Sequence, residues 1–526
     1  MRGKVMLALL ALITMSCSKE GPVSNRDLDY EYGQRLSHDK IVLGDRLENP
    51  YKTENITKAL NELYPTKADR IDVKTTDLYV RFLPSTQEEY DALEALGLRL
   101  LDHPMDYAIA VEGDWYHDPD VPEGNITWQY AVVPADFQFP DIKYEIIDEC
   151  HISEHDASTR SDDGIDWESV ERQAYMLTGN ENMLQPQTKA SSKSVRPKGR
   201  ITIQDKKYSN GNPIGVSGVK ISCNAFVKYD DTHTDKNGYF EMSKKFNSDI
   251  RYRLIFDNKE KFSIGFNFVL VPASVSTLGT ASPSGIKMTV TKDSEEKLYK
   301  RCVVNNAVYD YIQRCSSNDL DIAPPPSGLR IWIFHNLAAS SAVMLHHGAF
   351  LENKLIKTFL GEYAGLVKVF LPDLTIGVKN SDEYGEIYST TCHELAHASH
   401  FASVKEDYWD KYILYIVGSY ISSGGMTYGD GRSVNSGYCE IGEMWAYYLE
   451  SKMYHERYGG SYPTFGTSFW FRPQIFRYLE EKGVECNQIF EALTTKVTSL
   501  EELERTLTAA CPDMTETIEL IFDRYR

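Results

Sequence analysis

The stretch TCHELAHASH, residues 391–400, places three histidines and one glutamate within eight positions of a chain that has only 13 histidines. Its alanines favour an α-helix, on which residues four apart lie on one face about one turn apart. The imidazoles of His393 and His397 are therefore predicted to reach one metal ion. Glu394 lies about 100° round the helix from His393, where its carboxylate can act as a general base on a metal-activated water.

The H-E-x-x-H pattern in this stretch is rare enough to be informative. With 13 histidines and 76 acidic residues in 526 positions, roughly 0.05 random matches are expected. The alternative interpretation is a surface or core helix whose histidines bind nothing.

A catalytic zinc site needs a third protein ligand and leaves its fourth position to water. The stretch GYCEIGEMWAYY, residues 437–448, offers two acids, Glu440 and Glu443, on a predicted helix over residues 439–458. The four residues from Glu443 to Ala446 read E-x-[aromatic]-A.

Together with H-E-x-x-H, this second pattern resembles the gluzincin metallopeptidases, over about residues 329–455. The resemblance implies a zincin-like metallopeptidase domain, here expected over residues 293–526, and hydrolysis of a peptide bond. It also implies one Zn²⁺ ion held by His393, His397 and Glu443, with Glu394 as the base. Glu440, one turn from Glu443, is left as a second contact or as the alternative ligand.

Other residues near these motifs have more than one interpretation. Tyr438 directly precedes the ligand helix and is predicted to stabilise the oxyanion, as a tyrosine or histidine does in several gluzincins; the alternative is a packed aromatic ring. His400 shares the ligand face but lacks the metzincin spacing, so it is interpreted as a packed or hydrogen-bonded histidine, with an auxiliary metal contact as the alternative. His346 and His347 belong to no motif and are expected on a helix surface.

The C-terminal region is predicted to contain a mixed sheet followed by a helical half. A helix is expected over residues 295–314, and helices dominate after residue 404. Strands are expected at residues 329–334, 366–371 and 374–378.

The preceding region, residues 198–292, is predicted to be a small β-sandwich. Its short alternating segments are separated by Asn-Gly and Asp-Lys-Asn-Gly turns. Residues 213–219 and 234–240 resemble the carboxypeptidase regulatory-like (transthyretin-like) domain. That resemblance implies a spacer or binding accessory.

An N-terminal α+β domain is expected over residues 61–190, with a strand at 77–83 followed by a helix to about residue 97. Its scattered histidines, His103, His117, His151 and His155, are interpreted as solvated or structural. Residues 18–60 are polar and are predicted to form an extended tether. The fold class expected for the whole chain is therefore multidomain α+β.

The first 17 residues have a basic start and a short apolar run at residues 5–15, which is too short to span a membrane. The segment Thr14 to Cys17 resembles a bacterial lipoprotein cleavage box, so Cys17 is the predicted acylated N-terminus. A plain signal peptide cut near Ser16 is the alternative. The lipoprotein interpretation predicts an exported protein anchored to a bacterial membrane on its periplasmic or cell-surface face.

The composition of the chain excludes some partners. Its net charge of −20 repels phosphate backbones, so nucleic acid is not an expected partner. Beyond Cys17 the chain has eight cysteines, whose spacing assigns no disulfide.

Three functions are compatible with the sequence. The first is a lipid-anchored zinc endopeptidase acting on a protein or peptide substrate. The second is a catalytically silent zincin-like lipoprotein that binds or adheres. The third keeps zinc hydrolysis but acts on a glycopeptide or a cell-wall peptide.

Overall fold

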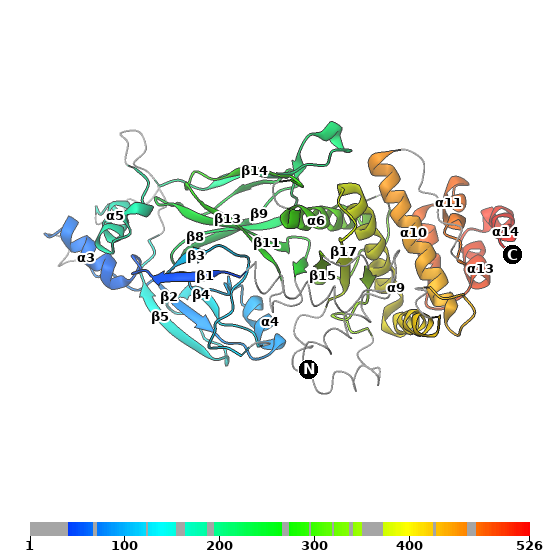
Figure 1. Ribbon diagram of the computed structural model, residues 1–526, viewed down its shortest axis with the longest axis horizontal. Helices are drawn as coiled ribbons and strands as arrows, with labels where there is room; N and C mark the ends of the chain where they lie inside the picture. Colours follow the sequence, from blue (N-terminus) through cyan, green and yellow to red (C-terminus); the bar gives the residue numbers. More distant parts are fainter. Residues whose placement is uncertain are drawn as a thin grey trace.

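The structure is a computed structural model of the chain, in which residues 40–66, 71–122, 125–153, 164–186, 194–265, 273–293, 296–317, 320–335, 340–349, 372–423, 428–459 and 470–526 are described. The predicted signal peptide with Cys17, the first part of the tether, His155 and the strand expected at 366–371 lie outside these residues. The molecule is elongated, with sheets at one end and helices at the other (Figure 1).

The N-terminal region combines two small sheets with three helices. β2 (Asp77–Phe82) lies between β4 (Gln129–Pro134) and β5 (Tyr144–Cys150), while β1 (Val42–Arg46) pairs with β3 (Tyr107–Val111). The helices are α3 (Thr53–Leu63), α4 (Gln87–Ala95) and α5 (Trp167–Leu177). The helix α4 ends within two residues of the expected position, and it begins at Gln87 because the side chain of Thr86 accepts a hydrogen bond from the backbone N–H of Glu89.

The tether predicted over residues 18–60 is wrong for residues 40–60, which contain β1 and most of α3. Tyr51 is buried, and its hydroxyl donates a hydrogen bond to Glu171 on α5. On α3, Ile56, Ala59 and Leu60 form an apolar stripe that packs against α5. Burial of this short apolar stripe against α5 fixes the position of an otherwise polar segment.

Two further sheets follow, built from the strands between residues 198 and 377. In one, β6 (Lys198–Ile203) pairs with β10 (Tyr239–Glu241), β14 (Lys287–Val290) and β7 (Ile214–Gly215). The other has eight strands: β8 (Val219–Ala225), β9 (Lys228–His233), β11 (Ile250–Asn258), β12 (Phe262–Gly265), β13 (Val275–Ala281), β15 (Leu329–Phe334), β16 (Ser341–Ala342) and β17 (Leu374–Gly377). Apolar side chains of the two sheets share one core.

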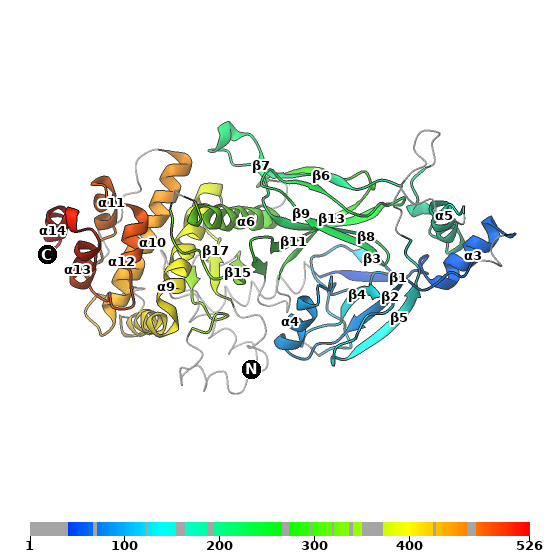
Figure 2. The ribbon, with the colours of Figure 1, turned by 180° about the vertical axis from the view of Figure 1, so that it is seen from behind.

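The eight-stranded sheet crosses the domain boundary expected at residues 292 and 293. β12 pairs in parallel with β15, from Phe262 opposite Leu329 to Gly265 opposite Trp332. The helix α6 (Glu296–Cys315) lies between these strands in sequence and shares the core of the sheet. The expected sandwich and the C-terminal region are therefore continuous through one sheet (Figure 2).

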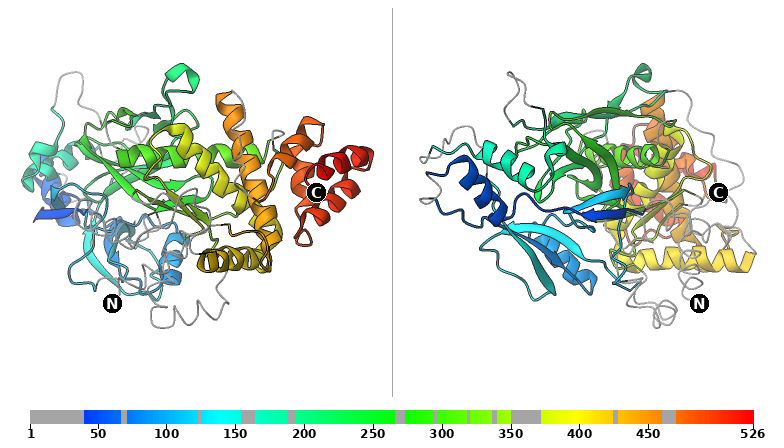
Figure 3. Two further views of the ribbon diagram at one scale, coloured as in Figure 1. Left: turned by 45° about the vertical axis from the view of Figure 1, so that its right-hand side comes forward. Right: turned by 60° about the vertical axis from the view of Figure 1, so that its left-hand side comes forward.

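The C-terminal half is helical, as predicted. The long helix α9 (Tyr384–Ser423) lies beside α10 (Ser436–Tyr458). Smaller helices cover the outer side of α10 (Figure 3): α11 (Gln474–Glu481), α12 (Cys486–Ala492), α13 (Leu500–Ala510) and α14 (Thr515–Asp523). A left-handed residue, Lys405 (φ 66°, ψ −174°), interrupts α9 and turns its second half back across the end of α10.

The cysteines and the hydropathy of the helices can be described for these residues together. The eight cysteines from Cys150 onward have buried side chains, and no disulfide joins them in the part of the chain that the structure describes. Within the same residues, no helix has the length and apolar character needed to cross a membrane.

Candidate metal centre

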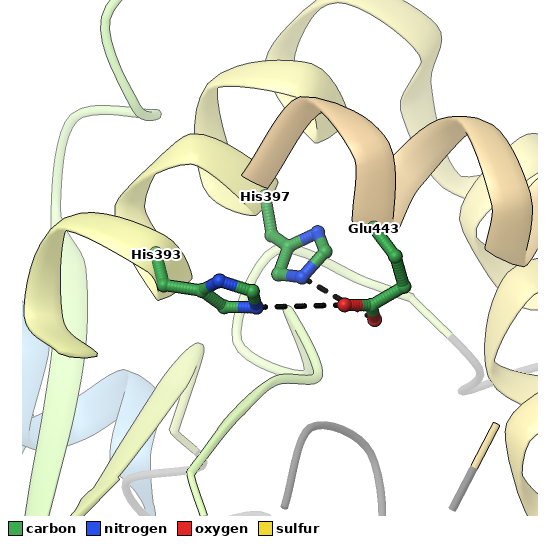
Figure 4. A group of neighbouring side chains, drawn as sticks. All are labelled: His393, His397 and Glu443. Carbon is green, nitrogen blue, oxygen red and sulfur yellow. Dashed lines mark ion pairs between the residues drawn. The ribbon is translucent and has the colours of Figure 1, made fainter. Parts of the chain in front are cut away.

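The three predicted ligands come together between two helices. His393 and His397 lie one turn apart on α9, and Glu443 faces them from α10 (Figure 4). One ligand atom from each of the three side chains can be chosen so that all lie within 4.8 Å of one another. His397 and Glu443 are fully buried and His393 is 4% exposed. The group can hold a metal ion.

The spacing of the two helices is fixed by aromatic side chains around the ligands. The indole nitrogen of Trp445 on α10 donates a hydrogen bond of 3.1 Å to the carbonyl of Ala396 on α9. The ring of Tyr412 packs on the backbone of α10 at Gly442, where a Cβ atom would lie 3.4 Å from it. The apolar contacts between α9 and α10 therefore set the position of the ligands.

The turn at Lys405 brings two more aromatic residues to the ligands. The rings of Trp409 and Tyr412 stack on each other and pack against His397, at ring distances of 5.7 and 5.5 Å. The hydroxyl of Tyr412 donates a 2.6 Å hydrogen bond to Oε1 of Glu443. One helix, by folding back, thus supplies two ligands and a group that orients the third.

The second ring nitrogen of His393 is held by another carboxylate. Oε2 of Glu450 lies 3.1 Å from Nδ1 of His393, and Oε1 of Glu450 accepts a 2.6 Å hydrogen bond from Ser389. Such a partner fixes the tautomer and the ring orientation of a metal-binding histidine. Glu450 is seven residues from Glu443, which is two helical turns on the same face. The spacing of these two glutamates is visible in the sequence and indicates a shared helical face.

The carboxylates around His393 also determine its protonation when no cation is bound. Burial by itself would lower the pKa of His393, but hydrogen bonds to Glu443 and Glu450, with the charges of Glu450 and Glu394, raise it to about 10. His397 behaves in the opposite way. Burial, followed by the charges of His393 and His400, holds the pKa of His397 well below its usual range. The site therefore holds a proton on His393 where a cation would bind.

Glu394, the predicted base, is buried at 1% exposure. Its charge is near enough to His393 to contribute to the raised pKa of that imidazole. The ring of Tyr447, not identified from the sequence, packs edge-on against His393 at 4.6 Å. Its hydroxyl lies 3.1 Å from the hydroxyl of Tyr428.

The other sequence candidates lie away from the three ligands. The ring of Tyr438 packs against Tyr408 at 4.5 Å, and Nζ of Lys411 lies 5.3 Å from its centre. Its predicted role at the oxyanion stays a prediction. Glu440 is half-buried, and burial, opposed by the charge of Arg472, raises its pKa to about 7.

The remaining histidines of this region have structural surroundings. His400 is buried against Tyr408 and Trp409, and burial lowers its pKa to about 3. It is packed, and it lies outside the group of three ligands. The expectation for His346 and His347 is wrong, since they lie in a turn, where Nδ1 of His347 is 2.9 Å from Oδ2 of Asp373.

Comparison of the chain with protein-family models, with curated proteins and with solved structures finds no match.

Proposed function

We propose that this chain is a zinc-dependent peptidase, exported and anchored to a bacterial membrane through lipidated Cys17, which acts on a protein or peptide substrate. The observation that carries the proposal is the convergence of His393, His397 and Glu443 in a buried site, with Glu394 next to the first ligand. A buried group of this kind is costly unless its charges are compensated. A bound cation would compensate them.

Both imidazoles lie close to the carboxylate of Glu443, each to a different oxygen, so the three side chains can share one ion. Nε2 of His393 is 3.5 Å from Oε2 of Glu443, and Nε2 of His397 is 3.6 Å from Oε1 of the same carboxylate. Two imidazoles and one carboxylate are also a ligand set of catalytic zinc, with a position left for water.

Each residue then has a defined role. When bound, zinc would supply Lewis acidity toward the scissile carbonyl and toward water. Glu394 accepts the proton of the attacking water and passes it to the leaving amine. Glu450 holds His393 in the tautomer whose Nε2 is available to a ligand, and Tyr412 holds the carboxylate of Glu443.

The proposal is tested with Glu394→Gln, which keeps the size of the side chain and removes the base. The variant should retain one zinc per chain by elemental analysis and lose about 10²- to 10⁴-fold in kcat on a peptide library. Glu443→Ala should lose the metal, whereas Glu440→Ala should retain it. Unchanged hydrolysis by Glu394→Gln would refute the assigned base.

The same measurements separate this function from the catalytically silent alternative. A wild-type protein that binds one zinc ion but cleaves neither peptides nor glycopeptides would favour the binding lipoprotein. The lipid anchor is tested separately, by incorporation of a labelled fatty acid, which Cys17→Ser should abolish. Export without acylation of the wild-type chain would indicate a plain signal peptide.

A further inference from the structure

A second site of interest lies at the other end of the molecule, between the β1–β3 ribbon and the eight-stranded sheet. A cavity of about 220 Å³ is lined there by residues from both parts, among them Ile109 of β3 and Arg251 and Arg253 of β11. Hydrogen bonds join the two parts around it. Arg251 donates to Glu112, and the hydroxyl of Thr277 donates to the carbonyl of Gly113. The cavity is thus a built feature of this junction.

Arg253 contributes a buried positive charge to this cavity. It is 2% exposed, and its guanidinium donates to Oδ1 of Asn224 at 2.8 Å and contacts Nε2 of His103 at 3.1 Å. Both partners are uncharged, since the pKa of His103, lowered to about 4 mainly by burial, leaves this imidazole neutral. Nε of Arg253 has no hydrogen-bond partner among the described residues.

The carboxylates nearby are engaged with other groups. Asp102 lies behind the imidazole, 2.7 Å from Nδ1 of His103. Of the acids that line the cavity, Glu112 pairs with Arg251, and Asp249 accepts a hydrogen bond from Gln185. In the described part of the chain, no ion pair is formed by Arg253 itself.

A guanidinium buried in this way is costly. An ion taken out of water loses hydration free energy, and neutral hydrogen-bond partners recover less of this loss than a close counter-charge does. The cost also acts on protonation, because burial, followed by the charge of Arg251, lowers the pKa of Arg253 to about 10. An anion in the cavity would remove the cost. Two arginines spaced two apart on one strand can face the same ligand.

The side chains that line the cavity indicate the chemical character of a ligand beyond its anionic group. Apolar side chains line it beside the arginines, including Leu47, Met105, Ile109, Met183 and Phe226. Its volume of about 220 Å³ admits a small molecule and excludes a folded partner or a long chain. Arginine binds a planar carboxylate through two parallel hydrogen bonds.

We propose that this cavity binds a small organic carboxylate with a short apolar body, whose carboxylate pairs with Arg253. The site is independent of the proposed metal centre and does not depend on the peptidase function. The ligand stabilises the junction between the N-terminal region and the eight-stranded sheet, because its head group contacts β11 while its body packs against β3.

The test uses benzoate as the probe and benzamide as its neutral isostere, titrated by calorimetry into the full mature chain. Benzoate should give a measurable heat of binding, and the dissociation constant of benzamide should be at least tenfold higher than that of benzoate. Arg253→Met, which keeps the length of the side chain, should weaken benzoate at least tenfold. Arg505→Met, a substitution on the exposed side of α13, should bind benzoate as the wild type does.

Several outcomes would overturn the proposal: equal binding of benzoate and benzamide, binding of neither, or undiminished benzoate binding by Arg253→Met. If Arg253→Met does not fold, the comparison of benzoate with benzamide on the wild-type protein still tests whether the cavity selects a carboxylate. The position of the ligand is then determined with 4-bromobenzoate by anomalous diffraction. Bromine beside Arg253 supports the site, and bromine only elsewhere on the protein refutes it.

Discussion

Among single residues, Glu450 has the most specific effect on the proposed metal centre without being a ligand. It holds Nδ1 of His393 at 3.1 Å and is itself held by Ser389. Removing a carboxylate that orients a ligand histidine typically weakens metal binding about 10- to 100-fold. Glu450→Ala is expected to show this loss in a competition titration with a chromophoric chelator.

Glu440→Ala is the matched control for Glu450→Ala, because it removes a carboxylate from the same helix at a position outside the group of ligands. Its metal affinity should stay within about twofold of the wild type, since Glu440 lies outside the group of ligands. Equal losses in the two variants would mean that Glu450 acts only through the total charge of the helix.

The pKa of His393, raised to about 10, predicts the pH dependence of metal binding. Below that pH the imidazole carries a proton that a metal ion must displace, so zinc affinity should rise about tenfold per pH unit between pH 7 and 9. The folding stability of the metal-free protein has the opposite pH dependence and falls as the pH rises. The contribution of protonated His393 to stability is complete below the unfolded pKa of 6.5 and is lost as the pH rises through about 10.

Calorimetry in two buffers of different ionisation enthalpy measures this proton directly. Zinc binding at pH 8 should release about one proton from His393. Glu450→Gln should release less, because it removes the charge of Glu450 and leaves a weaker, neutral acceptor, both of which lower the pKa of His393. Release of no proton by the wild type would contradict the assignment of His393.

The proximity of His393 and His397 could be predicted from the sequence because a helix fixes the relation of residues four apart. Glu443 needed the resemblance to a family as well, since its distance from His397 depends on how two helices pack. Tyr412 and Tyr447 could not be predicted, because the contacts of Tyr412 depend on the turn at Lys405 and those of Tyr447 on the packing of α10 against α9.

Among the elements, α9 is the one whose shape is least expected. Lys405 has φ 66° and ψ −174°, a backbone conformation that costs residues with a Cβ atom about 1–3 kcal/mol. Lys405→Gly should remove this strain at some cost in chain entropy, and raise the free energy of unfolding by about 1 kcal/mol. Chemical denaturation measures the change.

The control variant Lys405→Ala separates the effect of backbone strain on stability from the effect of losing the lysine side chain. Alanine keeps the Cβ atom, so its free energy of unfolding should stay within about 0.5 kcal/mol of the wild type. A gain in Lys405→Ala equal to that in Lys405→Gly would show that the lysine side chain, and not the backbone, is unfavourable.

Elements with strong local patterns were predicted well. The strands expected at residues 77–83, 329–334 and 374–378 correspond to β2, β15 and β17 within one residue at each end. The folded structure of residues 40–60 was not predicted, because α3 has only three clearly apolar positions on its buried stripe. These positions are covered by α5, which lies more than 100 residues later in the sequence.

In the whole molecule, the continuous sheet determines which parts can fold alone. A fragment of residues 293–526 would leave β15 without its partner β12 and would expose the face of α6 that packs into the shared core. This fragment should aggregate or remain unfolded, whereas residues 194–526 should fold. Circular dichroism and gel filtration of the two fragments distinguish these outcomes.

A folded, monomeric 293–526 fragment would show that the helical half needs no support from the β-sheets. The boundary was misplaced because the pairing of β12 with β15 joins residues more than 60 positions apart. Local periodicity identifies each strand but contains no information about such a pairing.

The buried cysteines have a chemical consequence. The thiolate is the reactive form of cysteine, and burial raises the pKa of Cys150 and Cys315 to about 12. Buried thiols of this kind react slowly with oxidants, because burial excludes the reagent and keeps the thiolate fraction small. Alkylation of Cys150 or Cys315 therefore requires the chain to open around that residue, so the rate of labelling measures how often these parts of the molecule open.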